Sequence, residues 1–412
     1  MTDLKVEVDP GEVGFDAKRL DRIEEHFRNY VLDGRLAGWL VTVGRDGKLV
    51  YVASHGKRDM EAGLPVQSDT IWRIYSMTKP ITSLAAMMLW EEGRFDLNDP
   101  VDAYIPSFRN GHVYTGGSAD HFETTPVHQP IRIWNLLSHT SGLSYGGQTD
   151  HPVDHGYQRA QKAATDAGKT DLEAMVDVWA SQPLLFEPGT HWFYSRATDV
   201  VGRLVEVVSG QPLDTFFAER ILEPLGMTDT AFSVPDDKTD RLASLYVPDP
   251  DSRKAVPAPD VRSTRISDFP SGGGGLFGTA GDYHRFCRLL LGGGEVDGVR
   301  LVSPKTIRMM ASNHLPGGVD IESMALEGVS ETSRAGMGFG LGFSIVLNPA
   351  RTKVSGSRGE FGWGGAASTV FWVDPRERIT AGFFTQLRPS NTWPIRPRLH
   401  QLIYQALVEP GR

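Results

Sequence analysis

The amino-acid sequence contains a single cysteine, Cys287, among its 412 residues, so no disulfide bond can form within the chain. It has no uninterrupted apolar stretch of the roughly 18 residues that a membrane-spanning helix needs. Positive charge is scarce too, since 42 Lys and Arg face 51 Asp and Glu and the formal net charge is −9. Nucleic acids and anionic membranes are bound through clustered Lys and Arg. We therefore expect neither as a partner, and the composition leaves the oligomeric state open.

The amino-terminal residues lack the basic start and the apolar stretch of a secretory signal. Together with the single cysteine, which fits a reducing compartment, this predicts a cytoplasmic protein. Cys287 itself lies among Phe286, Leu289 and Leu290, which recur at helical spacing. This pattern favours a buried, unreactive thiol over a nucleophile.

Strand patterns lie at both ends of the chain, and the stretch between them is mostly helical. The patterns that indicate strands are residues 38–44, 49–53, 339–347, 367–373 and 379–385. Those that indicate helices are residues 17–31, 76–92, 172–181, 199–209 and 396–408. We therefore predict two domains, an α/β domain from residues 1–98 and 261–412 and a mainly helical domain from residues 99–260. The first should contain an antiparallel sheet flanked by helices, with strands from both termini.

A Ser-x-x-Lys pattern, formed by Ser76 and Lys79, stands at the start of one predicted helix. Residues three apart share a helical face, so the Lys79 amine can reach the Ser76 hydroxyl. The free N–H groups at a helix start favour an oxyanion there, and Pro80 fits only in a first turn. The pattern indicates a serine nucleophile if the pKa of Lys79 is lowered by burial or a nearby cation. Taken alone, the pattern is weak and favours an exposed helix cap with a solvated lysine.

Five separated segments resemble, in order, the class C β-lactamase-like serine hydrolases, which include the family VIII carboxylesterases. They are residues 74–80 (Ile-Tyr-Ser-Met-Thr-Lys-Pro), 136–143 (Leu-Leu-Ser-His-Thr-Ser-Gly-Leu), 186–195 (Phe-Glu-Pro-Gly-Thr-His-Trp-Phe-Tyr-Ser), 222–228 (Leu-Glu-Pro-Leu-Gly-Met-Thr) and 273–282 (Gly-Gly-Gly-Leu-Phe-Gly-Thr-Ala-Gly-Asp). The resemblance implies the fold of β-lactamases and penicillin-binding proteins, which agrees with the strand and helix patterns. It also implies a serine hydrolase.

By the same resemblance, Tyr194 occupies the position of the family's catalytic tyrosine. A phenol with a pKa near ~10 acts as a base only if cations such as Lys79 stabilise its phenolate. The implied roles are Ser76 as nucleophile, Tyr194 as the general base that also protonates the leaving group, and Lys79 as the electrostatic partner of Tyr194. The sequence does not decide whether Tyr194 or Lys79 takes the proton.

Residues 362–366, Gly-Trp-Gly-Gly-Ala, match the third motif of the family and are expected on an edge strand. The resemblance implies that the N–H of Ala366 joins that of Ser76 in an oxyanion hole. Gly364 and Gly365 would let a substrate approach the strand closely.

Two departures from the family motifs bear on the substrate. Trp363 stands where β-lactamases have a cation for the carboxylate of a penicillin, and an indole suits an uncharged ester. Arg196 replaces an asparagine expected to bind the acyl group, which leaves weak β-lactam binding open. With Tyr145, these two residues are the predicted substrate contacts.

Other patterns have less specific interpretations. Ser144 lies in a Gly-x-Ser-x-Gly motif, but a helical pattern rather than a strand precedes it, so we do not expect a second nucleophile. His151 and His155 are four apart, but Pro152 is expected to prevent a helix, which favours a solvated loop over a zinc site. His139 is expected to be structural. We expect no metal ion and no cofactor.

The sequence therefore predicts a serine carboxylesterase that hydrolyses short-chain, uncharged esters, with a small-molecule substrate and an acyl-enzyme at Ser76. An acyltransferase, a D-aminopeptidase or a weak β-lactamase would use the same groups. A non-catalytic ligand-binding domain of the same fold is the alternative from another class.

Overall fold

The structure, a computed structural model, describes residues 4–261, 263–326 and 334–411. The α-helices are α1 (Ala17–Leu20), α2 (Arg22–Leu32), α3 (Thr78–Glu91), α4 (Ile133–Leu137), α5 (Pro152–Asp166), α6 (Leu172–Ala180), α7 (Ala197–Ser209), α8 (Leu213–Phe217), α9 (Ala280–Leu291), α10 (Pro304–Met310), α11 (Ile321–Met324), α12 (Pro349–Thr352) and α13 (Ile395–Tyr404). None of the helices in these ranges is long and apolar enough to cross a membrane.

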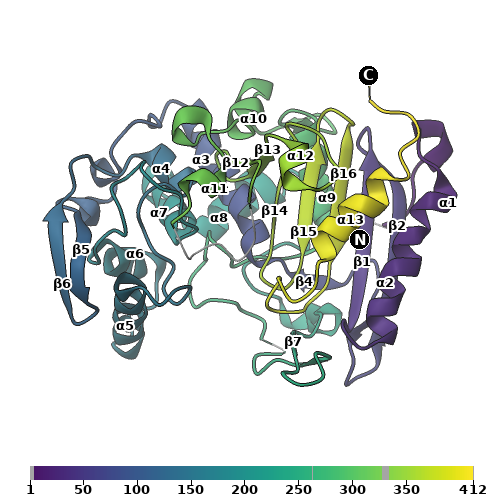
Figure 1. The fold of residues 1–412 in the computed structure, drawn as a ribbon, viewed down its shortest axis with the longest axis horizontal. Helices are drawn as coiled ribbons and strands as arrows, with labels where there is room; N and C mark the ends of the chain where they lie inside the picture. The colour runs from purple at the N-terminus through teal and green to yellow at the C-terminus, as the bar shows by residue number, and fades with distance from the viewer. Residues whose placement is uncertain (1–3, 262, 327–333, 412) are drawn as a thin grey trace.

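An eight-stranded antiparallel sheet forms the centre of the fold, in the order β12-β13-β14-β15-β16-β1-β2-β3. Its strands are β1 (Gly38–Arg45), β2 (Lys48–Asp59), β3 (Leu64–Pro65), β12 (Met337–Phe339), β13 (Ser344–Val346), β14 (Phe361–Gly364), β15 (Val370–Asp374) and β16 (Ile379–Phe384). Strands from the two ends of the chain are thus neighbours, as predicted, and purple β1 lies beside yellow β16 in Figure 1.

The remaining strands of the described residues form four two-stranded pairs. They are β4 (Ile71–Arg73) with β9 (Phe277–Thr279), β5 (His112–Ser118) with β6 (His121–Pro126), β7 (Tyr246–Pro248) with β8 (Ala255–Pro257), and β10 (Glu295–Val296) with β11 (Val299–Arg300). Strand β4 leads through the turn at Ser76 into α3, and β9 leads into α9.

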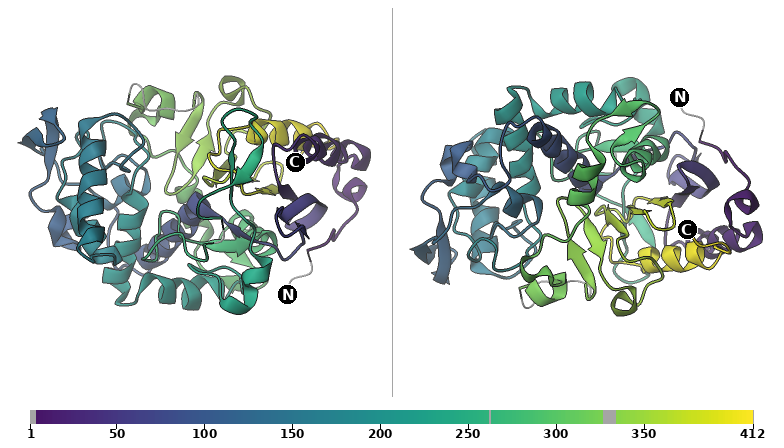
Figure 2. Two further views of the ribbon diagram at one scale, coloured as in Figure 1. Left: turned by 90° about the horizontal axis from the view of Figure 1, so that it is seen from below. Right: turned by 90° about the horizontal axis from the view of Figure 1, so that it is seen from above.

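Both faces of the sheet are buried because helices cover each of them. Successive side chains of a strand point to opposite faces, and in β16 Phe383 packs in a cluster with Phe27 of α2 and Leu399 of α13, whereas Phe384 packs with Tyr283 of α9. Seen from above and below, the α2 and α13 side of the molecule lies at the end opposite the blue, mainly helical part (Figure 2).

The part of the chain between β4 and β9 supplies α3 to α8 and packs against the sheet. Helix α3 contacts α7, and a single hydrophobic cluster joins Met87 of α3 and Val200 of α7 to Phe371 of β15. Because this core is continuous, the domain boundaries near residues 98 and 260 stay a prediction.

The structure corrects the predicted strand at residues 339–347. It consists of two strands, because the chain reverses between Phe339 and Ser344. Gly342 in this turn has a φ of +100°, and a Cβ there would lie 2.3 Å from the Ser83 hydroxyl. The alternating glycines therefore mark a hairpin rather than a continuous strand.

Two further expectations were wrong. The strand carrying Trp363, β14, lies between β13 and β15 rather than at an edge. Pro152 begins α5 instead of preventing a helix, because the first helical position needs no N–H donor and suits the fixed φ of proline. His151 caps this helix through Nδ1, which accepts the N–H of Val153 at 3.2 Å.

Candidate active site

A sharp turn between β4 and α3 presents Ser76. Tyr75 has a φ of +43°, which side chains other than glycine rarely adopt, and a 3-10 turn over Tyr75–Met77 precedes the helix. Residues held in such a conformation cluster at functional sites. Pro80 lies in the first turn of α3, as expected, and Lys79 follows Ser76 on the same face.

The Lys79 side chain is buried against Ser76. Its Nζ donates to the carbonyl oxygen of Gly273 at 2.6 Å and lies 3.4 Å from Ser76 Oγ. The Gly273 carbonyl belongs to the glycine run before β9, and a Cβ at Gly273 would lie 2.6 Å from the Asp199 carboxylate. The glycine therefore lets this backbone pass between Lys79 and Asp199.

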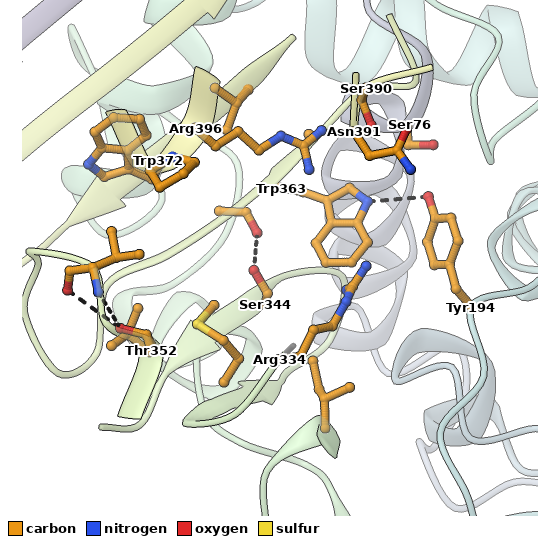
Figure 3. A pocket seen from close by; sticks show the side chains of 18 of the residues that line it. Ser76, Tyr194, Arg334, Ser344, Thr352, Trp363, Trp372, Ser390, Asn391 and Arg396 are labelled. Atoms are coloured by element: carbon orange, nitrogen blue, oxygen red, sulfur yellow. Dashed lines mark hydrogen bonds between the residues drawn. The ribbon is translucent and has the colours of Figure 1, made fainter. Parts of the chain in front are cut away.

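Tyr194 completes the predicted group of three. Its hydroxyl interacts with the Ser76 hydroxyl and accepts a hydrogen bond from Trp363 Nε1 at 3.2 Å (Figure 3). The Lys79 amine lies 4.5 Å from the centre of its ring. Ser76, Tyr194 and Trp363, which are more than a hundred positions apart in the sequence, thus meet at the hydroxyl group of Tyr194.

The electrostatics of this group differ from the roles that the family resemblance implied. Burial lowers the pKa of Lys79, against the opposing effects of Tyr145 and Asp199, and Arg196 lowers it further. Burial raises the pKa of Tyr194 to about 12, although its hydrogen bonds act in the other direction. At neutral pH, Tyr194 is therefore a protonated phenol.

The predicted oxyanion segment lies against the turn that carries Ser76. A Cβ on Gly365 would lie 2.5 Å from the Ile74 carbonyl oxygen, so only glycine allows this approach of the two backbones. Ala366 and Ser76 line the same cavity. The two N–H groups remain the predicted oxyanion donors.

Arg196 and Tyr145, predicted as substrate contacts, do not line the cavity that contains Ser76. The Arg196 guanidinium lies 4.3 Å from the Tyr145 ring centre and 3.6 Å from Asp199 Oδ2. Tyr145 in turn stacks on Tyr194, with ring centres 5.8 Å apart. Tyr145 and Arg196 thus pack around Lys79 and Tyr194 on the side that does not face the cavity.

The remaining candidates are structural in this arrangement. The Ser144 hydroxyl is fully buried and donates to the Asp154 carboxylate, away from the cavity lining. His139 is buried beneath Tyr194, 4.9 Å between ring centres, and burial holds its pKa well below the usual range. Within the described ranges, no three His, Cys, Asp or Glu side chains are grouped to hold a metal ion.

A cavity of about 700 Å³ extends from Ser76 over β14 to α13. Ser76, Tyr194, Trp363, Gly364 and Gly365 line one part of it, as the sequence predicted. Among the other lining residues, which the sequence analysis did not assign to the site, are Gln148, Trp192, Arg334, Trp372, Trp393, Arg396 and His400. Figure 3 shows the Arg334 and Arg396 side chains on either side of the Trp363 indole.

The fold and the three converging groups are those of a serine hydrolase. The family model described as Beta-lactamase matches residues 20–405, and the chain belongs to this family.

Three known proteins are similar to this chain over most of its length. The chain is 37% identical to Protein Rv1367c of Mycobacterium tuberculosis, over 90% of this chain and 91% of that one. It is 31% identical to Esterase EstB of Burkholderia gladioli, over 89% and 90% of the two chains. The solved structure of EstCE1, a hydrolase with promiscuous acyltransferase activity, matches with a TM-score of 0.74 at 26% identity, covering 95% of this chain and 98% of that chain.

Proposed function

We propose that the protein is a carboxylesterase that forms an acyl-enzyme at Ser76. The observation that carries the proposal is the meeting of Ser76, Lys79 and Tyr194 at one end of a cavity lined by the backbone of Gly364, Gly365 and Ala366. The likeness to Esterase EstB supports ester hydrolysis as the reaction. Trp363, in place of a cation, supports an ester rather than a β-lactam.

In the first step, Ser76 Oγ attacks the ester carbonyl carbon while its proton passes to Lys79 Nζ, 3.4 Å away. The lowered pKa of Lys79 favours the neutral amine needed to accept this proton. Tyr194, a phenol at neutral pH, then donates its proton to the leaving alkoxide oxygen and recovers a proton from Lys79. This assignment moves the role of general base from Tyr194, which the family resemblance implied, to Lys79, and it keeps Tyr194 as the proton donor to the leaving group.

The negative charge of the tetrahedral intermediate develops on the former carbonyl oxygen. The N–H groups of Ser76 and Ala366 are the proposed donors, and removal of one such donor typically slows acyl transfer about 10²–10³-fold. Collapse expels the alcohol, and water then attacks the acyl-enzyme by the same proton route in reverse.

The proposal is tested with p-nitrophenyl acetate and butyrate. Ser76→Ala should lose hydrolysis, and a fluorophosphonate probe should label Ser76 but not Ser144 in the wild-type protein, as read by peptide mass spectrometry. Labelling of Ser144, or full hydrolysis by Ser76→Ala, would contradict the assignment. Failure of the probe to label any serine would instead support a non-catalytic binding domain.

Acyl transfer to an alcohol is a second candidate, which the size of the cavity and the structural likeness to EstCE1 favour. Added alcohols should then divert part of the acyl group from water, at an unchanged rate of p-nitrophenol release if acylation limits turnover. A transferase would show mostly ester product at low alcohol concentration. Turnover of nitrocefin on the scale of the esters would favour a β-lactamase.

A further inference from the structure

We infer that Asp199 is a positioning residue of this site, which holds the backbone at Gly273 and so fixes the amine of Lys79. That amine is the proposed base of the esterase reaction, so the inference rests on the proposed function. Asp199 lies in the first turn of α7 and is not among the residues that line the cavity. It therefore acts through other residues and not by contact with the substrate.

The Asp199 carboxylate ties the glycine-rich segment before β9 to α7. It is fully buried, and its Oδ1 accepts hydrogen bonds from Ser271 Oγ at 2.6 Å and from the Gly273 N–H at 2.9 Å. Its Oδ2 lies 3.6 Å from Arg196 Nη1. A buried carboxylate is costly unless it is paired and hydrogen-bonded, and these contacts offset that cost. The carboxylate therefore fixes the N–H side of Gly273.

The carbonyl group of Gly273 faces Lys79, whose Nζ donates to it at 2.6 Å. A Cβ on Gly273 would lie 2.6 Å from Asp199 Oδ2, so the backbone passes too close to the carboxylate for any side chain. Helix α3 holds the same segment a second time, because Thr82 Oγ1 donates to the Gly272 carbonyl oxygen at 2.7 Å. Asp199 and Lys79 thus contact one residue, the first through its N–H and the second through its carbonyl group.

A fixed carbonyl group matters because it orients the Lys79 amine. A neutral amine has two N–H donors and one lone pair, and the lone pair must face the hydroxyl group whose proton it accepts. When one N–H is directed to the Gly273 carbonyl, the lone pair can face Ser76 Oγ, 3.4 Å from Nζ. Misplacement of a reacting group by about 1 Å can slow a reaction about 10²-fold. A displaced Gly273 carbonyl should therefore slow the proton transfer even when Lys79 is neutral.

Asp199 also acts on Lys79 through its charge. The titratable and charged side chains of the described residues that face the amine are Tyr145, Tyr194, Arg196, Asp199 and His139. Burial lowers the pKa of Lys79 and Arg196 lowers it further, whereas Tyr145 and Asp199 act to raise it. Loss of the Asp199 charge should therefore lower the pKa of Lys79, which is the opposite of the shift expected for loss of the Arg196 charge.

Two substitutions separate the effect of position from that of charge. Asp199→Asn keeps a carbonyl oxygen for the Gly273 N–H and removes the charge, so the rising limb of the kcat/KM profile for p-nitrophenyl butyrate should move to lower pH. Its kcat on the alkaline plateau should stay within about threefold of the wild-type value. Asp199→Ala also removes the acceptor, and its plateau kcat should fall about ten- to hundredfold. KM should change by less than about threefold in both variants.

The matched control is Ser271→Ala, which removes a hydrogen bond to the same carboxylate oxygen but leaves the contact with Gly273. It should lower the free energy of unfolding in urea and keep the wild-type pH profile and kcat. A purely structural Asp199 would behave in the same way. An unmoved limb in Asp199→Asn, or a plateau kcat in Asp199→Ala within about threefold of wild type, would overturn the inference. If Asp199→Ala does not fold, the limb in Asp199→Asn decides.

A failure of the proposed function is distinguishable from a failure of this inference. If esters are hydrolysed and the Asp199 variants keep the wild-type profile, only the inference fails. If no ester is hydrolysed, the esterase proposal fails, and the rate at which a fluorophosphonate labels Ser76 is measured against pH instead. A labelling limb at lower pH in Asp199→Asn, with slower labelling in Asp199→Ala, supports the inference. Identical labelling profiles in the three proteins, or no labelling of Ser76, overturn it.

Discussion

On the helical side of the cavity, Arg196 lies 3.6 Å from the Asp199 carboxylate, whereas on the sheet side Arg396 contacts two backbone carbonyls and no acid among the described residues. Arg196 lies 4.3 Å from the centre of the Tyr145 ring and acts on its protein neighbours, because it contributes, after burial, to the lowered pKa of Lys79. Arg396, in contrast, lines the cavity itself. The helical side therefore carries or supports groups of the proposed chemical step, whereas the sheet side supplies a large part of the cavity lining.

Among the substitutions on the helical side, Lys79→Met should give the largest loss of activity. Methionine keeps the length and burial of the side chain but removes the amine that lies 3.4 Å from Ser76 Oγ. Loss of a general base typically costs 10²–10⁴-fold, so kcat/KM for p-nitrophenyl butyrate should fall by about 10³-fold. Arg398→Met on the sheet side is the control. A fall of less than about tenfold would indicate that Lys79 is not the proton acceptor.

Asp154→Asn should destabilise the loop of residues 146–149, which follows Tyr145. Burial acts to raise the pKa of Asp154, but hydrogen bonds from Ser144 and from the N–H groups of Gly146, Gln148 and Thr149 lower it overall. A carboxylate with a lowered folded-state pKa adds stability above its unfolded pKa, which is lost as pH falls through the folded value.

We expect this substitution to cost about 1–3 kcal/mol at neutral pH, because the buried donors lose a charged acceptor. The difference in free energy of unfolding between wild type and Asp154→Asn, measured with urea, should shrink below about pH 4. A difference that stays constant between pH 3 and pH 7 would contradict the assigned ionisation.

Arg196→Met sharpens the comparison, since it removes the paired cation without touching the cavity lining. Because Arg196 lowers the pKa of Lys79 and pairs with Asp199, its removal should raise that pKa. The rising limb of the kcat/KM profile should move to higher pH, with a loss of less than about tenfold at neutral pH. The rates of wild type and variant should converge at alkaline pH. An equal loss at every pH would indicate a structural role alone.

The sequence predicted the helical side well, because its groups lie in short local patterns. Ser76 and Lys79 are three residues apart on one helical face, and Tyr194 lies in a motif of its own. The hairpin of β1 and β2 and the opening helix also followed from periodicity. The Pro152 error arose because one residue type can either end or begin a helix, depending on its position.

The sheet side was predicted only in part. Trp363, Gly364 and Gly365 were found by motif, but Arg396 approaches them from α13, and Arg334 approaches from the segment before β12. No local spacing connects these arginines with Ser76, and neither lies in a motif. The sequence offered one signal for Arg396. It directly follows Ile395 in a helix whose other buried residues are Leu399 and Ile403, and this pattern indicates burial rather than a ligand.

The last prediction concerns the far end of the sheet side, where His400 anchors α13. His400 Nε2 lies 2.8 Å from Glu360 Oε1 and its ring stacks on Trp372 at 3.7 Å, while the Tyr404 hydroxyl lies 2.7 Å from both Glu360 and Asp374. Burial lowers the pKa of His400, but the Glu360 carboxylate, the Arg396 carbonyl group and Asp374 together more than offset this, and the net shift is upward.

A histidine with a raised folded-state pKa contributes stability that is fully present below its unfolded pKa and is lost as pH rises through the folded value. The free energy of unfolding should therefore differ between wild type and His400→Gln by about 1 kcal/mol or less at pH 5–6, and the difference should shrink at higher pH. Hydrogen exchange in α13 should quicken over the same interval in wild type alone. The helical side would respond to acid through Asp154, and the sheet side to alkali through His400. A stability difference that grows with pH would show that His400 is neutral in the folded protein, and it would leave α13, which carries Arg396, without this charged anchor.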